Sequence, residues 1–376
     1  MNKPWRLRIQ QFLEKEDREL KLWQKLCHVP LVLLSQIYLA VIRCRQMAYR
    51  LGLRPVAKLP CRVICVGNLT VGGTGKTPTV ELVCRTLQHI GEQVGIISRG
   101  YGRHTFPASQ KSSDVLVVSD GRRVCAPVQA AGDEPMMLAR RLSGVPVVVG
   151  KSRLRAGQEA LRRFSLKTLV LDDGFQHLHL ARDVNILVLD GRKPFGNGHC
   201  LPAGSLREPP QALMRADLIL VTRTSTQEDR QRVEREIRRY NSKAPVIFGN
   251  HKPRDLMSLQ TDQTLPLSTL AGKSVVALCG IADPGAFLAT LRSLSAEIAE
   301  AIAFADHHWY SAAELRQASK RVLATKSWGL VTTEKDAVRM QPQWLQCPAW
   351  MLRVDMVLMA DGKKLWEERL KEQREG

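Results

Sequence analysis

The chain has 376 residues, of which 44% are hydrophobic and 24% are charged, and its formal net charge is +20 at pH 7. This length is more than one compact domain usually holds, and the composition is that of a folded chain with a substantial core. The nine cysteines are scattered and form no C-x-x-C pattern, which argues against a disulfide framework and a zinc module. The basic excess favours an anionic partner: a nucleotide, a phosphorylated substrate, a nucleic acid or an acidic membrane surface.

The first 50 residues contain an apolar run at 28–42 that follows a long charged segment. The run is shorter than the ~20 residues that span a bilayer, and the small-residue cleavage site of a signal peptide is not seen. Aromatic and basic side chains flank the run, which favours a helix lying in the membrane interface; a buried core helix is the alternative. The flanking residues are Trp5, Lys21, Trp23, Lys25, Arg43, Arg45 and Arg50.

Residues 51–250 alternate between strand and helix patterns. Continuous Val, Ile and Leu runs separated by helical segments are typical of a parallel sheet covered on both faces. We therefore predict an α/β domain here, with its first helix at 78–91, ending at a glycine. The predicted strands are residues 62–67, 93–100, 145–150, 166–174, 184–191 and 216–222.

A second, shorter series of the same kind occupies residues 251–355. The segment 243–270, rich in Pro, Asp and Asn, contains the connection between the two series. The pattern predicts a smaller second α/β domain with linker strands, followed by a C-terminal helix at 356–376. Its predicted strands are residues 273–281, 301–304 and 328–333, and its main helices are 284–294 and 311–326.

Residues 70–77 read T-V-G-G-T-G-K-T between a predicted strand and a predicted helix, which is the context that a phosphate-binding loop (P-loop) requires. The glycines let backbone N–H groups turn onto phosphate oxygens, and a helix N-terminus favours an anion. The lysine would reach the β- and γ-phosphates, and the last threonine would bind Mg²⁺. The loop departs from the strict pattern by starting on a threonine instead of a glycine, and a glycine-rich turn without a ligand is the alternative. The predicted nucleotide-binding residues are Thr70, Val71, Gly72, Gly73, Thr74, Gly75, Lys76 and Thr77.

The strand at 166–174 ends in Asp172 and Asp173, where a P-loop fold presents its Mg²⁺-organising carboxylate. Neighbouring strand residues point to opposite faces, so the two should have different roles, and a simple turn is the alternative. A guanine-reading N-K-x-D sequence is not found where it is needed, because residues 221–224 read V-T-R-T and the T-E-K-D at 333–336 lies in the second series. The nucleotide is therefore predicted to be ATP.

The residues of two further acidic segments allow either a catalytic or a structural role. Asp133 and Glu134, in G-D-E-P, could supply a general base or a metal ligand, or form the acidic first turn of a helix. In A-D-H-H-W-Y, a carboxylate stands beside His307; this suits a catalytic pair, and a helix N-cap or a surface loop explains it equally well. His177 and His179 have no second ligand pair at metal spacing, so zinc is not predicted.

Basic side chains follow several predicted strands, where arginine suits phosphate recognition. They are Arg99, Arg103, Lys151, Arg153, Arg155 and Arg207.

Taken together, the segments GNLTVGGTGKTP, SRGYGR, GDEP, DDGFQH, LPAGSLREP and FADHHWY resemble the tetraacyldisaccharide 4′-kinase family of lipid A biosynthesis. The resemblance covers nearly the whole chain. It implies transfer of the ATP γ-phosphate, with Mg²⁺, to the 4′-hydroxyl of an acylated disaccharide 1-phosphate. It also implies a P-loop kinase domain and a smaller α/β domain joined by a two-stranded linker, in a protein on the cytoplasmic face of the bacterial inner membrane.

The resemblance also assigns roles to residues. The family's base maps onto Asp133, aided by His307, and the metal ligands map onto Thr77, Glu134 and Asp173. We further expect Arg99, Arg207 and Asp172 to contact the substrate, and Lys76 to act in catalysis. The expected partners are the lipid substrate and an anionic membrane surface, with no nucleic acid, and we expect a monomer.

An ATP-driven conformational switch or metal-insertion factor is the alternative function, because it would use the same P-loop without a lipid acceptor. The interpretation as a nucleic-acid-binding protein rests on the net charge alone, since the sequence shows neither aromatic stacking platforms nor a recognition helix.

Overall fold

The computed structural model describes residues 22–100, 115–261 and 263–371, with side chains from His28 onward in the first helix. Some of the basic and aromatic residues weighed above lie outside the described residues: Trp5, Lys21 and Arg103, and the side chains of Trp23 and Lys25.

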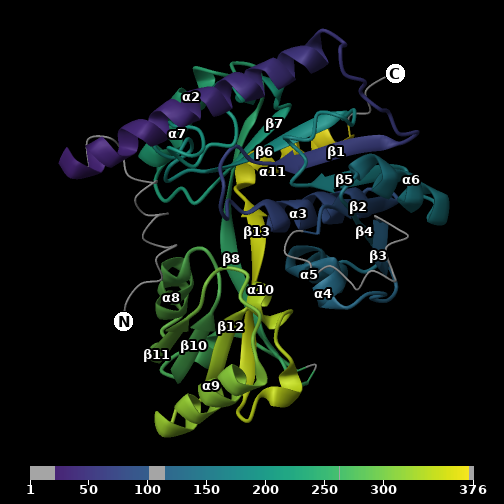
Figure 1. The fold of residues 1–376 in the computed structure, drawn as a ribbon. Helices are drawn as coiled ribbons and strands as arrows, with labels where there is room; N and C mark the ends of the chain where they lie inside the picture. Colours follow the sequence, from purple (N-terminus) through teal and green to yellow (C-terminus); the bar gives the residue numbers. More distant parts are fainter. Residues whose placement is uncertain (1–21, 101–114, 262, 372–376) are drawn as a thin grey trace.

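A sheet of 13 strands runs through the described part of the chain, in the order β11-β10-β12-β13-β8-β7-β6-β1-β5-β2-β4-β3, with β9 paired to β8 beside this path. Most neighbouring strands are parallel, and the pairs β3–β4, β8–β9 and β8–β13 are antiparallel. Figure 1 shows that helices cover two parts of this sheet separately: a large lobe around β1 to β7 and a small lobe around β10 to β12. The predicted α/β class with a mainly parallel sheet is confirmed.

The strands of the large lobe are short, apolar and mostly buried, as expected where helices cover both faces of a parallel sheet. β1 and β5 are parallel neighbours with Val66 opposite Asp172, so the loops that follow them leave at the same edge. β3 is an antiparallel edge strand that is not among the predicted strands. The strands are β1 (Arg62–Gly67), β2 (Val94–Ser98), β3 (Val115–Asp120), β4 (Pro146–Gly150), β5 (Thr168–Asp172), β6 (Val184–Asp190) and β7 (Leu218–Thr222).

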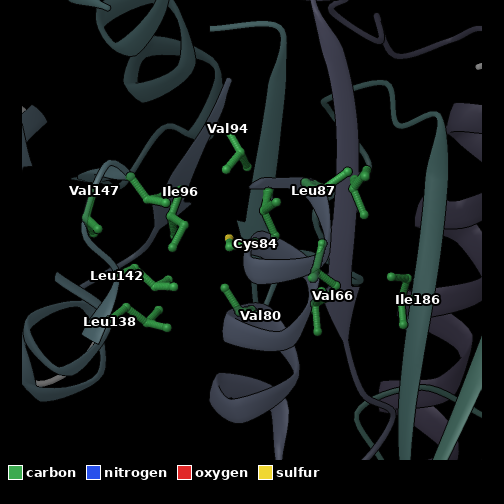
Figure 2. Packing of buried hydrophobic residues seen from close by; sticks show 14 of the residues in the cluster. Val66, Val80, Cys84, Leu87, Val94, Ile96, Leu138, Leu142, Val147 and Ile186 are labelled. Carbon is green, nitrogen blue, oxygen red and sulfur yellow. The ribbon is translucent and has the colours of Figure 1, made fainter. Parts of the chain in front are cut away.

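Helix α3 (Lys76–His89) packs on one face of this sheet and starts two residues earlier than predicted, at the P-loop lysine. Val80, Cys84 and Leu87 form its apolar stripe at helical spacing. Figure 2 shows these side chains pointing into a cluster with side chains of β1, β2 and β4. The other helices of the lobe are α4 (Val128–Ala131), α5 (Asp133–Arg141), α6 (Arg153–Arg163), η3 (Pro210–Arg215) and α7 (Gln227–Arg238).

The small lobe is a three-layer unit around β10. Alternate residues of this strand face opposite sides, so Val275 joins the cluster with α8 and Val276 the cluster with α9. Its strands are β10 (Ser274–Cys279), β11 (Glu297–Ala303) and β12 (Gly329–Thr333), and its helical segments are η4 (Leu267–Leu270), α8 (Pro284–Ser293), α9 (Ala312–Ala324), α10 (Glu334–Ala337) and η5 (Pro342–Trp344).

Two long antiparallel strands connect the lobes: β8 (Val246–Ser258) and β13 (Ala349–Leu358), with β9 (Thr264–Leu265) beside β8. The residues of the predicted connection are thus largely extended. Because β13 continues to Leu358, the C-terminal helix α11 (Ala360–Lys371) starts later than predicted. It returns to the large lobe, where Trp366 donates a hydrogen bond to Thr86 of α3 at 3.0 Å.

Helix α2 (Leu22–Arg50) lies along the large lobe, at the end of the molecule away from the small lobe (Figure 1). By length and composition its part from His28 to Arg50 could cross a membrane, and 11% of the apolar stretch is buried. One face docks through side chains: Ser35 donates to Cys200 O at 2.8 Å and Tyr38 donates to Arg207 O at 2.9 Å. The helix is therefore neither a buried core helix nor free of the lobe. Its exposed apolar face consists of Val29, Leu33, Leu34, Ile37, Val41 and Met47.

We expect the variant Leu33→Glu/Ile37→Glu to bind anionic phospholipid vesicles at least roughly tenfold more weakly than the wild type, since burying each such side chain contributes ~1.5–3 kcal/mol. Both side chains are 63% exposed, so thermal unfolding should be unchanged. Leu323→Glu, at a 66% exposed site on α9, is the matched control and should bind normally in vesicle co-sedimentation. Unchanged binding of the double variant would contradict a membrane-docking role for this face.

Candidate functional site

The P-loop, residues 70–77, connects β1 to α3 as predicted, and buried neighbours set its shape. The side-chain amide of Asn68 donates to Thr70 O at 2.7 Å and to the Thr74 hydroxyl at 3.0 Å. Gly75 has a φ of 96°, and a β-carbon there would lie 2.7 Å from a ring carbon of His251, so both conformation and space require glycine. The loop is therefore held in place by the protein itself.

Asp173 brings two predicted site residues together. Lys76 Nζ lies 3.9 Å from its Oδ1, and Arg207 Nη1 donates to both carboxylate oxygens at 2.9 and 2.8 Å. Burial opposes ionisation of Asp173, but Lys76 and Arg207 outweigh it and hold the pKa below its usual value. The φ of Asp173 is 50°, a conformation that non-glycine residues rarely adopt and that functional sites tolerate.

The loop 199–208 joins the P-loop to α2. Arg207 N donates to Leu69 O at 2.7 Å, and Val71 N donates to Ser205 O at 2.8 Å. On its other side the same loop accepts the hydrogen bond of Tyr38. The loop 199–208 therefore contacts both α2 and the P-loop, and it links their positions.

Asp172 is the last residue of β5 and Asp173 follows it outside the strand, so strand alternation does not govern the two side chains. The two carboxylates nevertheless contact different residues. Asp172 is 1% exposed and accepts a hydrogen bond from Ser98 at 2.9 Å, while its Oδ1 is buried without a hydrogen-bond partner among the described residues. Burial, and then the charges of Glu134 and Asp173, raise its pKa to about 7. A carboxylate that is buried beside other carboxylates favours a cation nearby.

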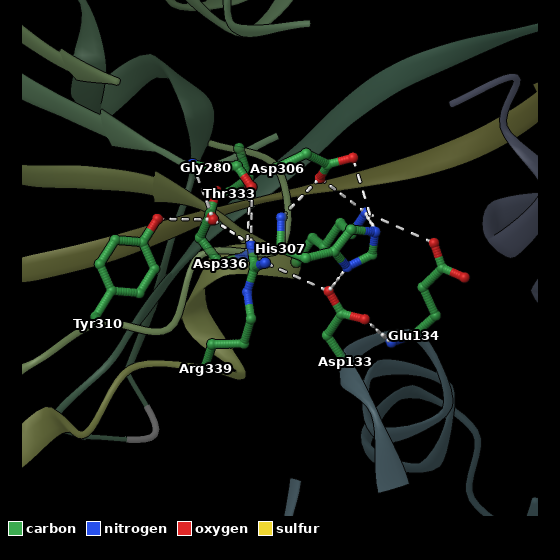
Figure 3. A network of polar contacts seen from close by, with 10 residues as sticks. Asp133, Glu134, Gly280, Asp306, His307, Tyr310, Thr333, Asp336 and Arg339 are labelled. Atoms are coloured by element: carbon green, nitrogen blue, oxygen red, sulfur yellow. Dashed lines mark hydrogen bonds and ion pairs between the residues drawn. The ribbon is translucent and has the colours of Figure 1, made fainter. Parts of the chain in front are cut away.

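Asp133 and His307 are 174 residues apart in sequence, and His307 Nδ1 lies 2.8 Å from Asp133 Oδ2 (Figure 3). Asp133 is the first residue of α5 in the large lobe, so the helix-start interpretation of G-D-E-P also holds. His307 follows β11 in the small lobe, with a φ of 61°. The pair spans the two lobes.

The charge of Asp133 is well compensated. Burial opposes its ionisation, but His307, then Lys335 and Arg339, outweigh burial and lower its pKa. Arg339 Nη1 lies 3.5 Å from Asp133 Oδ2. The carboxylate is therefore ionised at neutral pH.

Five residues to which the sequence analysis assigned no role in the site support this pair from the small lobe. Fully buried Asp336 accepts hydrogen bonds from Tyr310 at 2.8 Å and from Thr333 Oγ1 at 2.6 Å, and it pairs with Arg339 (Figure 3). Its neighbour Lys335 reaches His307. Lys335 and Asp336 belong to T-E-K-D, which was weighed only as a guanine motif; charged residues directly after a buried strand were a usable signal.

Arg141, the last residue of α5, makes a second link between the lobes. Its side chain is 4% exposed, with Nη1 2.7 Å from Glu81 Oε2 of α3 and Nε 3.3 Å from Glu334 Oε1 of α10. It also donates to Val354 O of β13 at 3.0 Å. Helix α5 thus contacts the small lobe at both ends, which fixes the position of Asp133.

Arg99 is exposed at the carboxyl end of β2. It lies near Arg153, which is 5% exposed and whose pKa is lowered by burial and then by Arg99. Arg153 in turn lies near Asp172 and Asp173. The edge of the sheet where the P-loop lies therefore carries a positive region that suits an anionic ligand.

The chain is similar to known proteins in family, sequence and structure. The family model described as tetraacyldisaccharide-1-P 4′-kinase matches residues 27–374. A relative named tetraacyldisaccharide 4′-kinase, from Syntrophus aciditrophicus (strain SB), is 41% identical over 312 residues, which cover 80% of this chain and 81% of that protein. One of the same name from Anaeromyxobacter dehalogenans (strain 2CP-C) is 41% identical over 330 residues, covering 88% and 85%.

A solved structure is also similar. The crystal structure of "apo" form LpxK from Aquifex aeolicus in complex with ATP superposes with a TM-score of 0.71 at 30% sequence identity. The superposition covers 92% of this chain and 99% of that chain. The similarity therefore extends through both lobes and the strands that connect them.

Proposed function

The chain belongs to the tetraacyldisaccharide 4′-kinase family, and from that premise we propose how its residues carry out the reaction. The enzyme transfers the γ-phosphate of ATP to the 4′-hydroxyl of a tetraacyldisaccharide 1-phosphate, which forms the 4′-phosphorylated lipid A precursor. The observation that carries our assignment of roles is the 2.8 Å contact between Asp133 and His307 across the lobes.

Phosphoryl transfer needs charge neutralisation and alignment more than covalent catalysis. We assign the ATP phosphates to residues 70–77, where Lys76 would neutralise the β- and γ-phosphates beside the helix N-terminus. We assign the acceptor side to Asp133, which would take the proton of the 4′-hydroxyl, with His307 holding the carboxylate in place. Because the two residues come from different lobes, the pair exists only when the lobes are closed, and closure also excludes water.

Glu134 and Asp173 lie near enough to Asp172 for their charges to raise its pKa, and such a group of carboxylates suits the Mg²⁺ ion that accompanies ATP. Thr77, Glu134 and Asp173 offer the oxygen donors that Mg²⁺ prefers and would hold it. Asp172 has a buried carboxylate oxygen without a partner among the described residues, which suits a nearby cation. Bound Mg²⁺ would neutralise charge on the phosphate oxygens.

The lipid acceptor would reach the site from the side of α2. We propose that the exposed apolar face of α2 rests on an anionic bilayer at the cytoplasmic face of the inner membrane, to which the net charge of +20 is suited. Arg99 and Arg207 would contact anionic groups of the substrate. Asp172, also predicted as a substrate contact, is 1% exposed, and we assign it to the metal side instead. We propose that the protein acts as a monomer and binds no nucleic acid.

An assay of ATP turnover with and without a disaccharide 1-phosphate lipid tests the function. We expect ADP and the 4′-phosphorylated lipid in equal amounts with the lipid, and little ADP without it, because the closed site excludes water. ADP release that does not depend on the lipid would favour the conformational-switch ATPase instead.

A further inference from the structure

Lys335 places its ammonium group among three groups of the site. Its Nζ lies 3.3 Å from His307 Nε2, 3.3 Å from Asp306 Oδ1 and 3.6 Å from Glu134 Oε1. The first two groups belong to the small lobe and the third to the large lobe. Figure 3 shows Asp306, Glu134 and Asp133 around the His307 ring.

The base of this lysine is rigidly anchored. Lys335 lies on α10, where the Thr333 hydroxyl accepts a hydrogen bond from Asp336 N at 3.2 Å and caps the helix. The Asp336 carboxylate is fully buried and accepts from Gly280 N at 3.0 Å as well as from Tyr310. These hydrogen bonds hold the backbone of α10 in place, so that the Lys335 side chain starts from a fixed position near His307.

The contact decides which nitrogen of His307 carries the proton in the neutral ring. An ammonium group only donates hydrogen bonds, so at Nε2 it requires a lone pair. The ring proton is then on Nδ1, from which it is donated to Asp133 Oδ2 at 2.8 Å. In the other tautomer an N–H would face the ammonium group of Lys335 and a lone pair would face the Asp133 carboxylate, and both contacts would be repulsive. Asp306 Oδ2 also faces Nε2, but at 3.7 Å it is beyond hydrogen-bond distance and farther than Lys335.

We propose that Lys335 is a positioning residue for the phosphoryl transfer, which selects the Nδ1–H tautomer of His307 and thereby fixes the orientation of the Asp133 carboxylate. It also connects this pair to Glu134, which we assign to Mg²⁺. This inference rests on the proposed roles of Asp133 and His307, because Lys335 acts on the reaction through the imidazole ring.

The kinetic test replaces Lys335 by methionine, which keeps much of the length and removes the donor. We expect kcat to fall roughly 10–100-fold, as when the orienting partner of a site histidine is lost, with little change in the KM for ATP. In the His307→Ala background the same substitution should change kcat less than about threefold, because its target is gone. Lys335→Arg should recover part of kcat. Lys320→Met, at an exposed site on α9, is the matched control and should behave as wild type.

The spectroscopic test uses the wild-type protein, so it does not depend on the folding of a Lys335 variant. The ¹⁵N chemical shifts of the His307 ring, assigned by their loss in His307→Ala, should report a proton on Nδ1 and none on Nε2. Any other protonation pattern overturns the inference, and so does an equal fold loss from Lys335→Met with and without His307. If Asp133→Asn and His307→Ala both keep full activity, the roles proposed for this pair fail, and the inference fails with them; if they lose activity and the Lys335 results differ from expectation, only this inference fails.

Discussion

The variant Asp133→Asn should lose roughly 10²–10⁴-fold in kcat, the contribution of a positioned general base, with little change in the KM for ATP. Asparagine keeps the shape of the side chain but cannot take the proton of the acceptor hydroxyl, while the assigned ATP contacts lie on residues 70–77. The fold should persist, because Arg339 keeps Asp336 and the carbonyl of Gly280 as partners. Steady-state kinetics with the lipid acceptor, together with thermal unfolding, measure both effects.

His307→Ala should lower kcat to a similar or smaller degree, since the His307 ring is hydrogen-bonded to the Asp133 carboxylate. If the two residues act as a unit, the double variant should lose little more than the worse single variant. Asp361→Asn and His89→Ala, at exposed sites on α11 and α3, are the matched controls. Multiplicative losses would mean that the residues act independently. An Asp133→Asn variant with normal kcat and a raised KM for Mg-ATP would mark Asp133 as a metal ligand.

Lys76→Ala should lower kcat by roughly 10²–10³-fold, the cost of removing one preorganised group that stabilises transition-state charge. The KM for ATP should also rise, because the lysine contacts the phosphates before the reaction as well. The fold should survive, since Asp173, the carboxylate that Lys76 contacts, retains its two hydrogen bonds from Arg207.

Lys167→Ala, at an exposed site of the large lobe, is the matched control for the lost charge and should leave kinetics unchanged. Thermal unfolding of Lys76→Ala near the wild-type temperature, together with the kinetic loss, would support the assignment of the loop to ATP. A near wild-type kcat for Lys76→Ala would contradict the assignment of this loop to ATP.

The sequence determined the P-loop and the strand that ends in Asp172 and Asp173. Both signals are local: a strand, a glycine-containing turn and a helix start are specified by consecutive residues and by hydrogen bonds within a few positions. The apolar runs also predicted a mainly parallel sheet, but the order of its strands came only from the structure. Strand alternation between Asp172 and Asp173 was predicted as well, but β5 ends at Asp172, and the left-handed turn at Asp173 sets the direction of the second carboxylate.

Only the tertiary structure decided how α2 packs, because its flanking residues favoured an interfacial helix while its apolar run also fitted a core helix. The contacts of Ser35 and Tyr38 with the loop 199–208 show that one face docks and the other stays exposed. Neither partner of these hydrogen bonds has a pattern that points to the other. Backbone carbonyl acceptors, such as Arg207 O, are available on every residue and carry no sequence signal.

The pairing of Asp133 with His307 was also left open by the residues themselves, since each fits a helix start or a loop. Their contact depends on how β8 and β13 run antiparallel between the lobes, which places residues 174 positions apart at 2.8 Å. T-E-K-D was set aside because its spacing does not fit guanine recognition. Yet Lys335 contacts His307, and Asp336 pairs with Arg339, which lies 3.5 Å from Asp133. A local pattern specifies how a few neighbouring residues fold, whereas a site made by two lobes depends on the sum of all the packing between them.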